Sequence, residues 1–476
     1  MAAGDDDKPT VVVVMVALPL QGHLNQLLHL SRLISAHNIP IHFVSTTTHS
    51  PLAKLRLHGW NPNAVNHIFF HDLPIFPPII NPNPNNNSTT NFPSHLHPLC
   101  ESATHLRRPV AALLRQLSPT ARRLVVIHDS LMSSVVQDFV SLPNAESYAF
   151  HSVSAFAIGL FTSEKGGERI RGLVKPCGLE KDEVSFEGCF SKEFLRFIAG
   201  QHEYAKLSSG RIYNTCRVVE QPILEVLETE ARNNGNKLLW ALGPFNPVNI
   251  RSESNFSRKD DGGAVEIRCL NWLDKQSSKS VIFVSFGTTT SFSEQQIIEI
   301  AIGLEKSDHK FVWVVRDADR GDFARDDTNH VELPKGYEDR VKDRGLVVRE
   351  WAPQLHILAH PSVGGFMSHC GWNSCIESIS MGVPIAAWPM HSDQPNNALL
   401  VTKILKVGFL VKDWFLGEKM VAATTVEKSV RRLMGSKEGE EMRNRAVVLG
   451  RGVRKSVRDN GVSQIELESF IAHISR

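Results

Sequence analysis

Residues 11–37 read VVVVMVALPLQGHLNQLLHLSRLISAH. The first eight of them are apolar and mostly β-branched, a composition typical of a strand that is buried on both faces. After the turn PLQGH, residues 24–37 place leucines and Ile34 at helical spacing. The stretch therefore predicts a strand, a turn and a helix, which is the repeating unit of a parallel α/β sheet.

The same alternation continues outward from this unit. IPIHFVST (39–46) predicts a second strand, and later apolar runs predict further strands at 123–130, 280–287, 309–317, 346–351, 363–369 and 383–389. EGEEMRNRAVVLGRGVRKSV and SQIELESFIAHISR predict two terminal helices. Because the strands are separated by longer helix-period segments, we expect a doubly wound α/β architecture.

Two stretches interrupt the pattern. Residues 77–93 are rich in Pro and Asn without a period, which predicts a mobile surface loop, and the polar residues 251–263 are typical of a linker. The expected partition is an N-terminal domain (1–245), a linker (246–263), a C-terminal domain (264–455) and a C-terminal helix (456–476) that packs back on the N-terminal domain.

Composition excludes several classes of function. The chain of 476 residues has 52 Lys and Arg against 50 Asp and Glu, so its net charge of +2 does not favour binding to nucleic acid or to a membrane. Seven cysteines without a CxxC pair fit a reducing compartment, and the acidic N-terminus is unlike a secretory signal. We therefore expect a cytoplasmic protein, a monomer, with a local small-molecule site.

Ligands of open α/β sheets bind at the carboxyl ends of the strands. His23 follows the first strand at the start of a helix, where the helix dipole opposes protonation and leaves a neutral imidazole that can act as a base. Asp129 ends another strand, from which it could orient His23 and stabilise its imidazolium. The alternative is that His23 only caps the helix or lies on the surface.

The second half offers a place for a phosphate group. Ser285 and Thr288 flank a glycine at the end of one strand. Residues 363–382 predict a strand, a turn and a helix that begins at Trp372, where free N–H groups and the dipole suit a diphosphate. His369, Asn373 and Ser374 add donors there, although Asn373 and Ser374 could instead merely cap the helix.

Other familiar motifs are missing from the sequence. There is no GxGxxG after the first strand, no GxxxxGK[ST] and no HExxH, which disfavours a Rossmann dehydrogenase or a P-loop enzyme. Asp317-Ala318-Asp319 lies in a charged stretch and is interpreted as a solvated turn. We therefore predict no metal site.

The stretch from Trp351 to Gln394 carries the landmarks WAPQ, HCGWNS, a glutamate and DQ. It resembles the plant secondary product box of the plant family-1 UDP-glycosyltransferases, and the resemblance extends over nearly the whole chain. It implies a GT-B fold, in which two Rossmann-like doubly wound domains face each other across a cleft. The acceptor then binds in the first domain and the UDP-sugar in the second.

The resemblance also implies roles for single residues. His23 and Asp129 match the base and its supporting carboxylate in an inverting displacement at the anomeric carbon. The implied donor site takes uracil on Trp351 with Ala352 beside it, ribose near Gln354 and Glu377, the diphosphate at His369, Asn373 and Ser374 with help from Ser285 and Thr288, and the sugar at Trp372, Asp393 and Gln394. It implies no metal and no cofactor, with UDP-glucose as co-substrate; UDP-xylose is left open.

Within the family the chain is most similar to the zeatin O-glycosyltransferases, through segments such as FPSHLHP (92–98), DSLMSSVVQD (129–138) and PMHSDQPNN (389–397). This implies O-glucosylation of the side-chain hydroxyl of a zeatin-type cytokinin, with the zeatin isomer undetermined. Two alternatives are O-glucosylation of a flavonoid or other phenolic, and a non-catalytic binding protein. Gln26 stands where Pro is common in the wider family and is not expected to alter the chemistry.

Overall fold

The computed structural model describes most of the chain. The described residues are 10–57, 60–75, 92–162, 164–179, 185–233, 235, 237–248, 263–289, 292–315, 332–412, 414 and 420–476. The predicted mobile loop at 77–93, apart from its last two residues, lies outside them. So do most of the predicted linker and the Asp317-Ala318-Asp319 turn.

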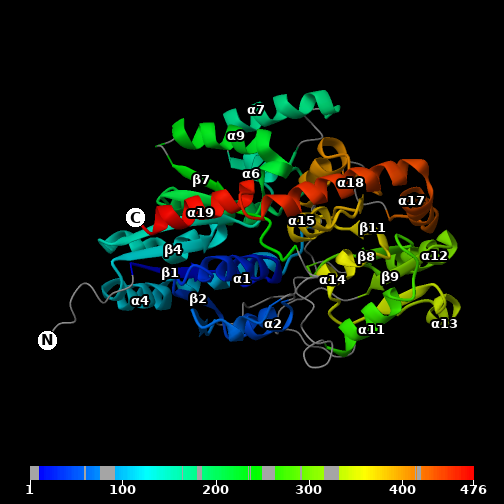
Figure 1. Ribbon diagram of the computed structural model, residues 1–476, viewed down its shortest axis with the longest axis horizontal. Helices are drawn as coiled ribbons and strands as arrows, with labels where there is room; N and C mark the ends of the chain where they lie inside the picture. The colour runs from blue at the N-terminus through cyan, green and yellow to red at the C-terminus, as the bar shows by residue number, and fades with distance from the viewer. Residues whose placement is uncertain are drawn as a thin grey trace.

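The N-terminal half forms a seven-stranded parallel sheet (Figure 1). Its central strand β1 (Val11–Val16) is buried along its whole length and pairs with β2 (Ile41–Thr46) on one side and β4 (Arg123–Asp129) on the other. The strand order is β3-β2-β1-β4-β5-β6-β7. The order therefore reverses direction between β1 and β4, as in doubly wound folds.

The C-terminal half repeats this arrangement with six strands. β8 (Val281–Ser285) lies between β9 (Lys310–Val314) and β11 (Val363–Ser368), in the order β10-β9-β8-β11-β12-β13. The outer strands are β10 (Gly345–Val348), β12 (Ile385–Ala387) and β13 (Gly408–Leu410). Every pairing is parallel, so the predicted doubly wound architecture is confirmed in both halves.

Five strands were not predicted from the sequence. They are β3 (Ile68–Leu73), β5 (Ala145–His151), β6 (Gly210–Tyr213), β7 (Leu238–Ala241) and β13. β6, β7 and β13 are too short to stand out as apolar runs, whereas β3 is an edge strand with partly exposed side chains and β5 mixes polar with apolar residues. These five strands therefore lack the continuous apolar run that made the central strands recognisable in the sequence.

Helices cover both faces of each sheet. α1 (Gln21–Ser35) begins three residues earlier than predicted, so His23 lies within its first turn. α15 begins at Trp372, as predicted, and ends at Met381 before Gly382, whose φ of 76° closes the helix. Further helices are α2 (His49–Leu55), α3 (Leu96–Ala103), α4 (Arg107–Leu117), α6 (Ala155–Thr162), α7 (Glu164–Val174), α8 (Lys192–Ala205), α9 (Arg217–Asn233), α11 (Ala264–Leu273), α12 (Glu294–Ser307), α14 (Gln354–Ala359), α16 (Gln394–Leu399) and α17 (Ala423–Gly435).

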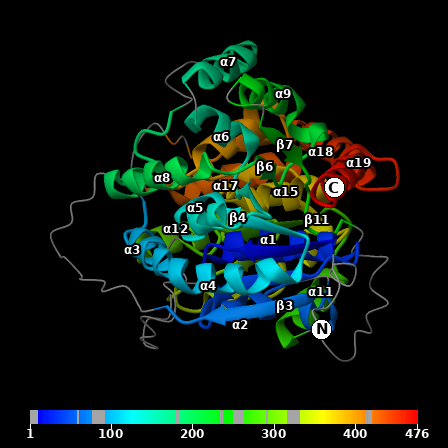
Figure 2. The ribbon, with the colours of Figure 1, turned by 90° about the vertical axis from the view of Figure 1, so that its left-hand side faces the viewer.

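The chain ends in two helices, α18 (Lys437–Ser456) and α19 (Val462–Ile474), where two were predicted. Figure 1 shows them running from the second sheet back over the first, and Figure 2 shows α19 on the opposite side of the N-terminal half from α3 and α8. Phe470 of α19 is fully buried against Tyr148 and Trp240 of the first sheet. The C-terminal helix is thus part of the N-terminal hydrophobic core.

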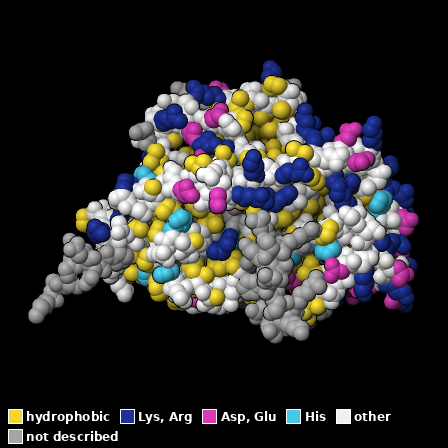
Figure 3. Space-filling view, viewed as in Figure 1, with side chains coloured by type: hydrophobic (Ala, Val, Ile, Leu, Met, Phe, Trp, Pro, Cys, Tyr) yellow, Lys and Arg dark blue, Asp and Glu magenta, His cyan; other side chains and the backbone are white. Residues whose placement is uncertain are grey.

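The surface of the molecule carries mixed charge. Figure 3 shows Lys and Arg side chains gathered where α18 crosses this face, with acidic side chains nearby on α19. In the part of the chain that the structure describes, no helix is both long and apolar enough to span a bilayer.

Candidate active site

The two sheets bring the carboxyl ends of their central strands to a single cavity. Asp129 and Ser285 are the last residues of β4 and β8, His369 directly follows β11, and His23 lies in the first turn of the helix after β1, so both switch points contribute to it. The cavity, of about 330 Å³, lies between the halves. It is lined by His23 and by every predicted donor-site residue: Ser285, Thr288, Trp351, Ala352, Gln354, His369, Trp372, Asn373, Ser374, Glu377, Asp393 and Gln394.

Asp129 lies behind His23 and does not line the cavity. Its Oδ2 is 2.6 Å from Nδ1 of His23, and its Oδ1 accepts a hydrogen bond of 2.9 Å from the N–H of Leu131. The carboxylate is fully buried, whereas the imidazole is 19% exposed to the cavity. Because a carboxylate only accepts, the contact places a proton on Nδ1 and leaves Nε2 as the acceptor.

His23 does not cap its own helix. The N-cap residue of α1 is Leu20, without a side-chain hydrogen bond to the helix. The alternative of a capping histidine is therefore wrong, and the side chain is instead held by a buried carboxylate at the edge of a cavity.

The pKa of His23 departs from what the helix position alone suggests. Burial lowers it, but the charge and hydrogen bond of Asp129, with a smaller contribution from Asp393, outweigh burial and raise the pKa above its ordinary value of 6.5. The expected effect of the helix start is overridden because Asp129 is in direct contact. His23 is therefore mostly unprotonated only at a pH above that required by a histidine with the ordinary pKa of 6.5.

Ser152 is a second neighbour of the base that sequence reasoning missed. Its Oγ lies 2.9 Å from Nδ1 of His23. Ser152 directly follows β5, which was not predicted as a strand, so the position was not recognised as a carboxyl end. A search of every residue that follows a strand, including strands of mixed composition, would have found it.

The helix start predicted to take a diphosphate also contacts the other half of the molecule. The N-cap of α15 is Gly371, without a side-chain hydrogen bond, so Asn373 and Ser374 do not cap it. Asn373 Nδ2 donates to the carbonyl of Gly22 at 2.7 Å, and the indole N–H of Trp372 donates to the carbonyl of Asn214 at 2.8 Å. The start of α15 is therefore both a place of unpaired N–H groups and a domain contact.

His369 sits between two loops that have no room for side chains. A Cβ at Gly287 or at Gly371 would come within 2.5 Å of its Nε2, and Gly287 also has a φ of 79°. Burial lowers the pKa of His369 to about 4. The imidazole is therefore neutral at physiological pH and can offer a hydrogen bond rather than a charge.

Glu377 is a buried carboxyl group with one strong partner. Gln354 Nε2 donates to Glu377 Oε2 at 2.8 Å and to Ser374 Oγ at 3.0 Å. Burial raises the pKa of Glu377 to about 7, against the opposing effect of the hydrogen bond from Gln354. The guanidinium carbon of Arg56 lies 4.5 Å from the centroid of the Trp351 ring, so a cation of the N-terminal half covers one face of this ring.

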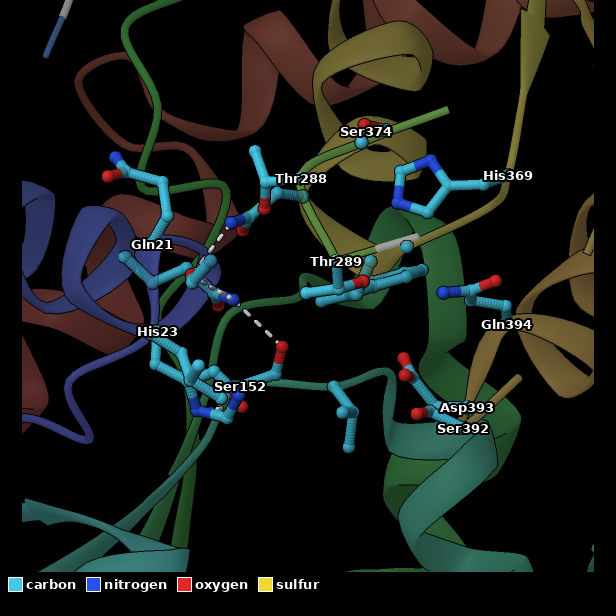
Figure 4. A pocket seen from close by; sticks show the side chains of 18 of the residues that line it. Gln21, His23, Ser152, Thr288, Thr289, His369, Ser374, Ser392, Asp393 and Gln394 are labelled. Atoms are coloured by element: carbon cyan, nitrogen blue, oxygen red, sulfur yellow. Dashed lines mark hydrogen bonds between the residues drawn. The ribbon is translucent and has the colours of Figure 1, made fainter. Parts of the chain in front are cut away.

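Asp393 and Gln394 face His23 across the cavity (Figure 4). Asp393 Oδ2 accepts from Asn397 Nδ2 at 2.6 Å, and burial raises the pKa of Asp393 although Asn397 and His23 oppose this. Gln394 Oε1 accepts from the backbone N–H of Met390 at 3.0 Å. Two polar side chains are thus held in place opposite the base.

Aromatic side chains that sequence reasoning did not single out line the rest of the cavity. Phe92 stacks obliquely on Phe194 of α8 with ring centroids 4.6 Å apart, and Phe161 meets Phe186 at 5.1 Å. Phe190 lies between these pairs, 5.7 Å from Phe194. Phe186, Phe190 and Phe194 are four residues apart, but only Phe194 lies on α8, so helical spacing does not identify these rings as a group.

No group of three or more His, Cys, Asp or Glu side chains that could hold a metal ion occurs among the described residues.

Comparisons with known proteins match both halves of the chain. Residues 9–247 match the family model described as glycosyltransferase, N-terminal domain, and residues 264–437 match the model described as UDP-glucoronosyl and UDP-glucosyl transferase. The chain is 52% identical to a zeatin O-glucosyltransferase of Phaseolus lunatus and 50% identical to a zeatin O-xylosyltransferase of Phaseolus vulgaris, each over 100% of both chains.

A solved structure confirms the fold. UGT71G1 of Medicago truncatula, complexed with UDP-glucose, is similar with a TM-score of 0.76 at 24% identity, over 98% of this chain and 99% of that one. The GT-B architecture expected from the sequence is therefore present. With family models matching on both sides of the cavity and full-length relatives at half identity, the chain belongs to the UDP-glycosyltransferase family.

Proposed function

We propose that this protein is an inverting O-glucosyltransferase that uses UDP-glucose and acts on the side-chain hydroxyl of a zeatin-type cytokinin. The class of enzyme follows from the family, and the acceptor is supported by the full-length relative that is 52% identical and named for zeatin. The observation that carries the chemistry is the contact of 2.6 Å between His23 and Asp129 at the edge of the cavity.

The geometry supports a single displacement. Nε2 of His23 takes the proton of the acceptor hydroxyl as that oxygen forms a bond to the anomeric carbon, while Asp129 holds Nδ1–H and stabilises the imidazolium. The bond between the anomeric carbon and the UDP oxygen breaks, and UDP leaves with the electron pair from the opposite face. The configuration of the sugar is inverted.

The start of α15 is the proposed site for the charge that develops on the diphosphate. Its backbone N–H groups have no side-chain cap, and His369 and Ser374 line the cavity beside it. Such donors stabilise a leaving group most when they are already in place before the reaction. Asp393 and Gln394, on the far side from His23, are the proposed partners of the sugar hydroxyls.

The nucleoside end of the donor is assigned to the Trp351 region. Trp351 offers a ring face to uracil with Ala352 beside it, and Glu377 with Gln354 is placed to receive the ribose hydroxyls. An ionised Glu377 accepts hydroxyl hydrogen bonds more strongly than the protonated carboxyl group does. Donor binding is therefore linked to the loss of a proton whose pKa is about 7 in the empty site.

The acceptor is assigned to the aromatic part of the cavity. Rings of Phe161, Phe190 and Phe194 suit a flat, weakly polar molecule, because stacked or edge-on ring contacts add to the free energy of burying its surface. A purine fits this description, and so does a phenolic ring system. An O-glucosyltransferase of flavonoids or other phenolics is therefore the second candidate.

We also infer that the enzyme works as a monomer in the cytoplasm. Both sides of the cavity come from one chain, and all seven cysteines are unpaired, which fits a reducing compartment.

The test is an incubation of the purified protein with UDP-glucose or UDP-xylose and, separately, trans-zeatin, cis-zeatin, dihydrozeatin and a flavonoid, with products identified by mass spectrometry. The expected product is a zeatin O-glucoside. A flavonoid glucoside alone would overturn the acceptor, and a xyloside alone would overturn the donor.

His23→Ala tests the base in the same assay. We expect about 10²–10⁴-fold lower turnover, because general-base help of this size is lost. The variant should still fold but unfold at a lower temperature, because the fully buried Asp129 carboxylate loses its contact with His23. Full activity of this variant on any acceptor would show that His23 is not the base.

A further inference from the structure

Gln26 was expected to be neutral for the chemistry, but its side chain is only 3% exposed and is fully engaged at the base. Its Nε2 donates to the carbonyl of Ser152 at 2.8 Å and to that of Gly22 at 3.2 Å. Its Oε1 accepts from Asn214 Nδ2 at 3.0 Å. One amide therefore joins the start of α1 to the segments that follow β5 and β6.

Two of these partners are direct neighbours of His23. Gly22 precedes it in the chain, and Ser152 places its Oγ 2.9 Å from Nδ1. The amide of Gln26 thus holds the backbone on both sides of the imidazole. A shift of either carbonyl moves the base relative to Asp129 or to the cavity.

The same amide is linked to the donor half of the molecule. The side chain of Asn214 donates to Gln26, and its backbone carbonyl accepts a hydrogen bond of 2.8 Å from the indole N–H of Trp372. Gly22, the second acceptor for Gln26, also receives Asn373 Nδ2 at 2.7 Å. Both routes end at the start of α15, the proposed diphosphate site.

We propose that Gln26 is a positioning residue for the base, which it holds against Asp129 and in register with the donor helix α15. The inference deepens the proposed function and rests on it only for the role of His23. An unbranched apolar side chain would fill the space but leave the carbonyl of Ser152 and the amide of Asn214 without this partner. Small displacements of a reacting group are costly, because rate depends steeply on the geometry of attack.

The test compares Gln26→Met with a matched control, Gln296→Met. Gln296 is also a buried glutamine, whose side chain donates to the carbonyl of Val421 and accepts from its N–H, both at 2.9 Å. It lies on α12 and does not line the cavity. The control therefore loses comparable hydrogen bonds without a link to His23.

We expect kcat of Gln26→Met to fall about tenfold or more, with the KM for UDP-glucose changed by less than about threefold. Gln296→Met should keep kcat within about twofold while losing a comparable amount of thermal stability. The acceptor is any compound that the unsubstituted enzyme glycosylates, so an error in the zeatin assignment does not affect the result.

A double-mutant cycle with Ser152→Ala separates positioning from general destabilisation. If Gln26 acts through Ser152, kcat of the double variant should lie within about twofold of kcat of the slower single variant. If Gln26→Met retains full kcat, the proposal is wrong.

A readout without an acceptor distinguishes failure of this inference from failure of the proposed function. The titration of His23 is followed by NMR in protein labelled with ¹⁵N-histidine and assigned with His23→Ala. We expect the pKa of His23 to drop by about half a unit or more in Gln26→Met, because the imidazole moves away from the Asp129 charge. It should not move in Gln296→Met, and an unchanged titration in Gln26→Met would overturn the proposal.

Discussion

The two sides of the cavity are built in different ways. Ten of the twelve residues assigned to the donor come from one continuous stretch, Trp351 to Gln394, whereas the aromatic side chains of the acceptor side come from separate segments between Phe92 and Phe194. The donor side uses polar side chains at strand ends and at a helix start. Their residue types and their positions in the predicted elements can be recognised from the sequence. The acceptor side uses phenylalanines, which in any sequence are most simply read as core.

The two sides also differ in their electrostatics. The donor side holds a neutral His369 and a carboxyl group, Glu377, whose pKa burial raises to about 7. The acceptor side has the proposed base, His23, with a buried carboxylate 2.6 Å from its Nδ1. We therefore expect substitutions on the two sides to have different effects. Those on the donor side should change the affinity for the donor, and those on the acceptor side should change catalysis or the choice of acceptor.

The largest separable effect is expected for Asp129→Asn. The base acts unprotonated, so activity should rise with pH and be half-maximal above pH 6.5 in the unsubstituted enzyme, because Asp129 raises the pKa of His23. Removing the charge should move the half-maximal pH downward, while kcat/KM at its plateau falls about a hundredfold because the asparagine no longer favours Nδ1–H. A pH profile of kcat/KM measures both changes.

The matched control is Asp138→Asn, which removes a carboxylate on the surface, where Arg107 Nε donates to it at 2.9 Å. It should leave both the plateau and the half-maximal pH unchanged. An upward shift of the half-maximal pH in Asp129→Asn would contradict the assignment.

Next in size is the effect of Glu377→Gln on the donor side. Since ribose hydroxyls bind the ionised carboxylate more strongly and burial raises the pKa of Glu377 to about 7, the affinity for UDP-glucose should weaken as pH falls from 8 to 6, by up to about tenfold. The glutamine variant should bind more weakly at pH 8 and lose this dependence. Calorimetric titration with UDP-glucose in the absence of acceptor, at pH 6 and at pH 8, measures the affinity of both proteins.

In the same pH range His369 stays neutral, because burial holds its pKa near 4. If the pH dependence of donor binding survives in Glu377→Gln, the titrating group lies elsewhere, and the proposed ribose contact loses its support.

The smallest effect is expected for Phe194→Ala on the acceptor side. Loss of its ring contacts with Phe92 and Phe190 should raise the KM for the acceptor about fivefold and leave the affinity for UDP-glucose within about twofold. Phe197→Ala is the control, since Phe197 packs on Phe194 from the same helix but does not line the cavity. An equal rise in acceptor KM in both variants would mean that only the packing of α8 matters.

Much of the fold could be predicted because its central strands carry their own signal. β1, β8 and β11 are buried on both faces and therefore read as unbroken apolar runs. The short strands β6, β7 and β13 are defined by pairing with neighbours rather than by their composition. The equally short β10 and β12 were predicted because each overlaps a longer strand-like segment of the sequence, 346–351 or 383–389.

By itself, the sequence determined the doubly wound class and the identity of His23 and Asp129 as candidates, because these depend on local periodicity and on residue types at strand ends, whereas the donor box was identified by its resemblance to a known family. Only the tertiary structure decided that Ser152 and Gln26 adjoin the base, that Trp372 and Asn373 reach across to the N-terminal half, and that phenylalanines far apart in sequence line one cavity. The physical reason is that parallel strands bring their carboxyl ends together from any distance along the chain, and that burial and contact, rather than residue type, set the pKa values there.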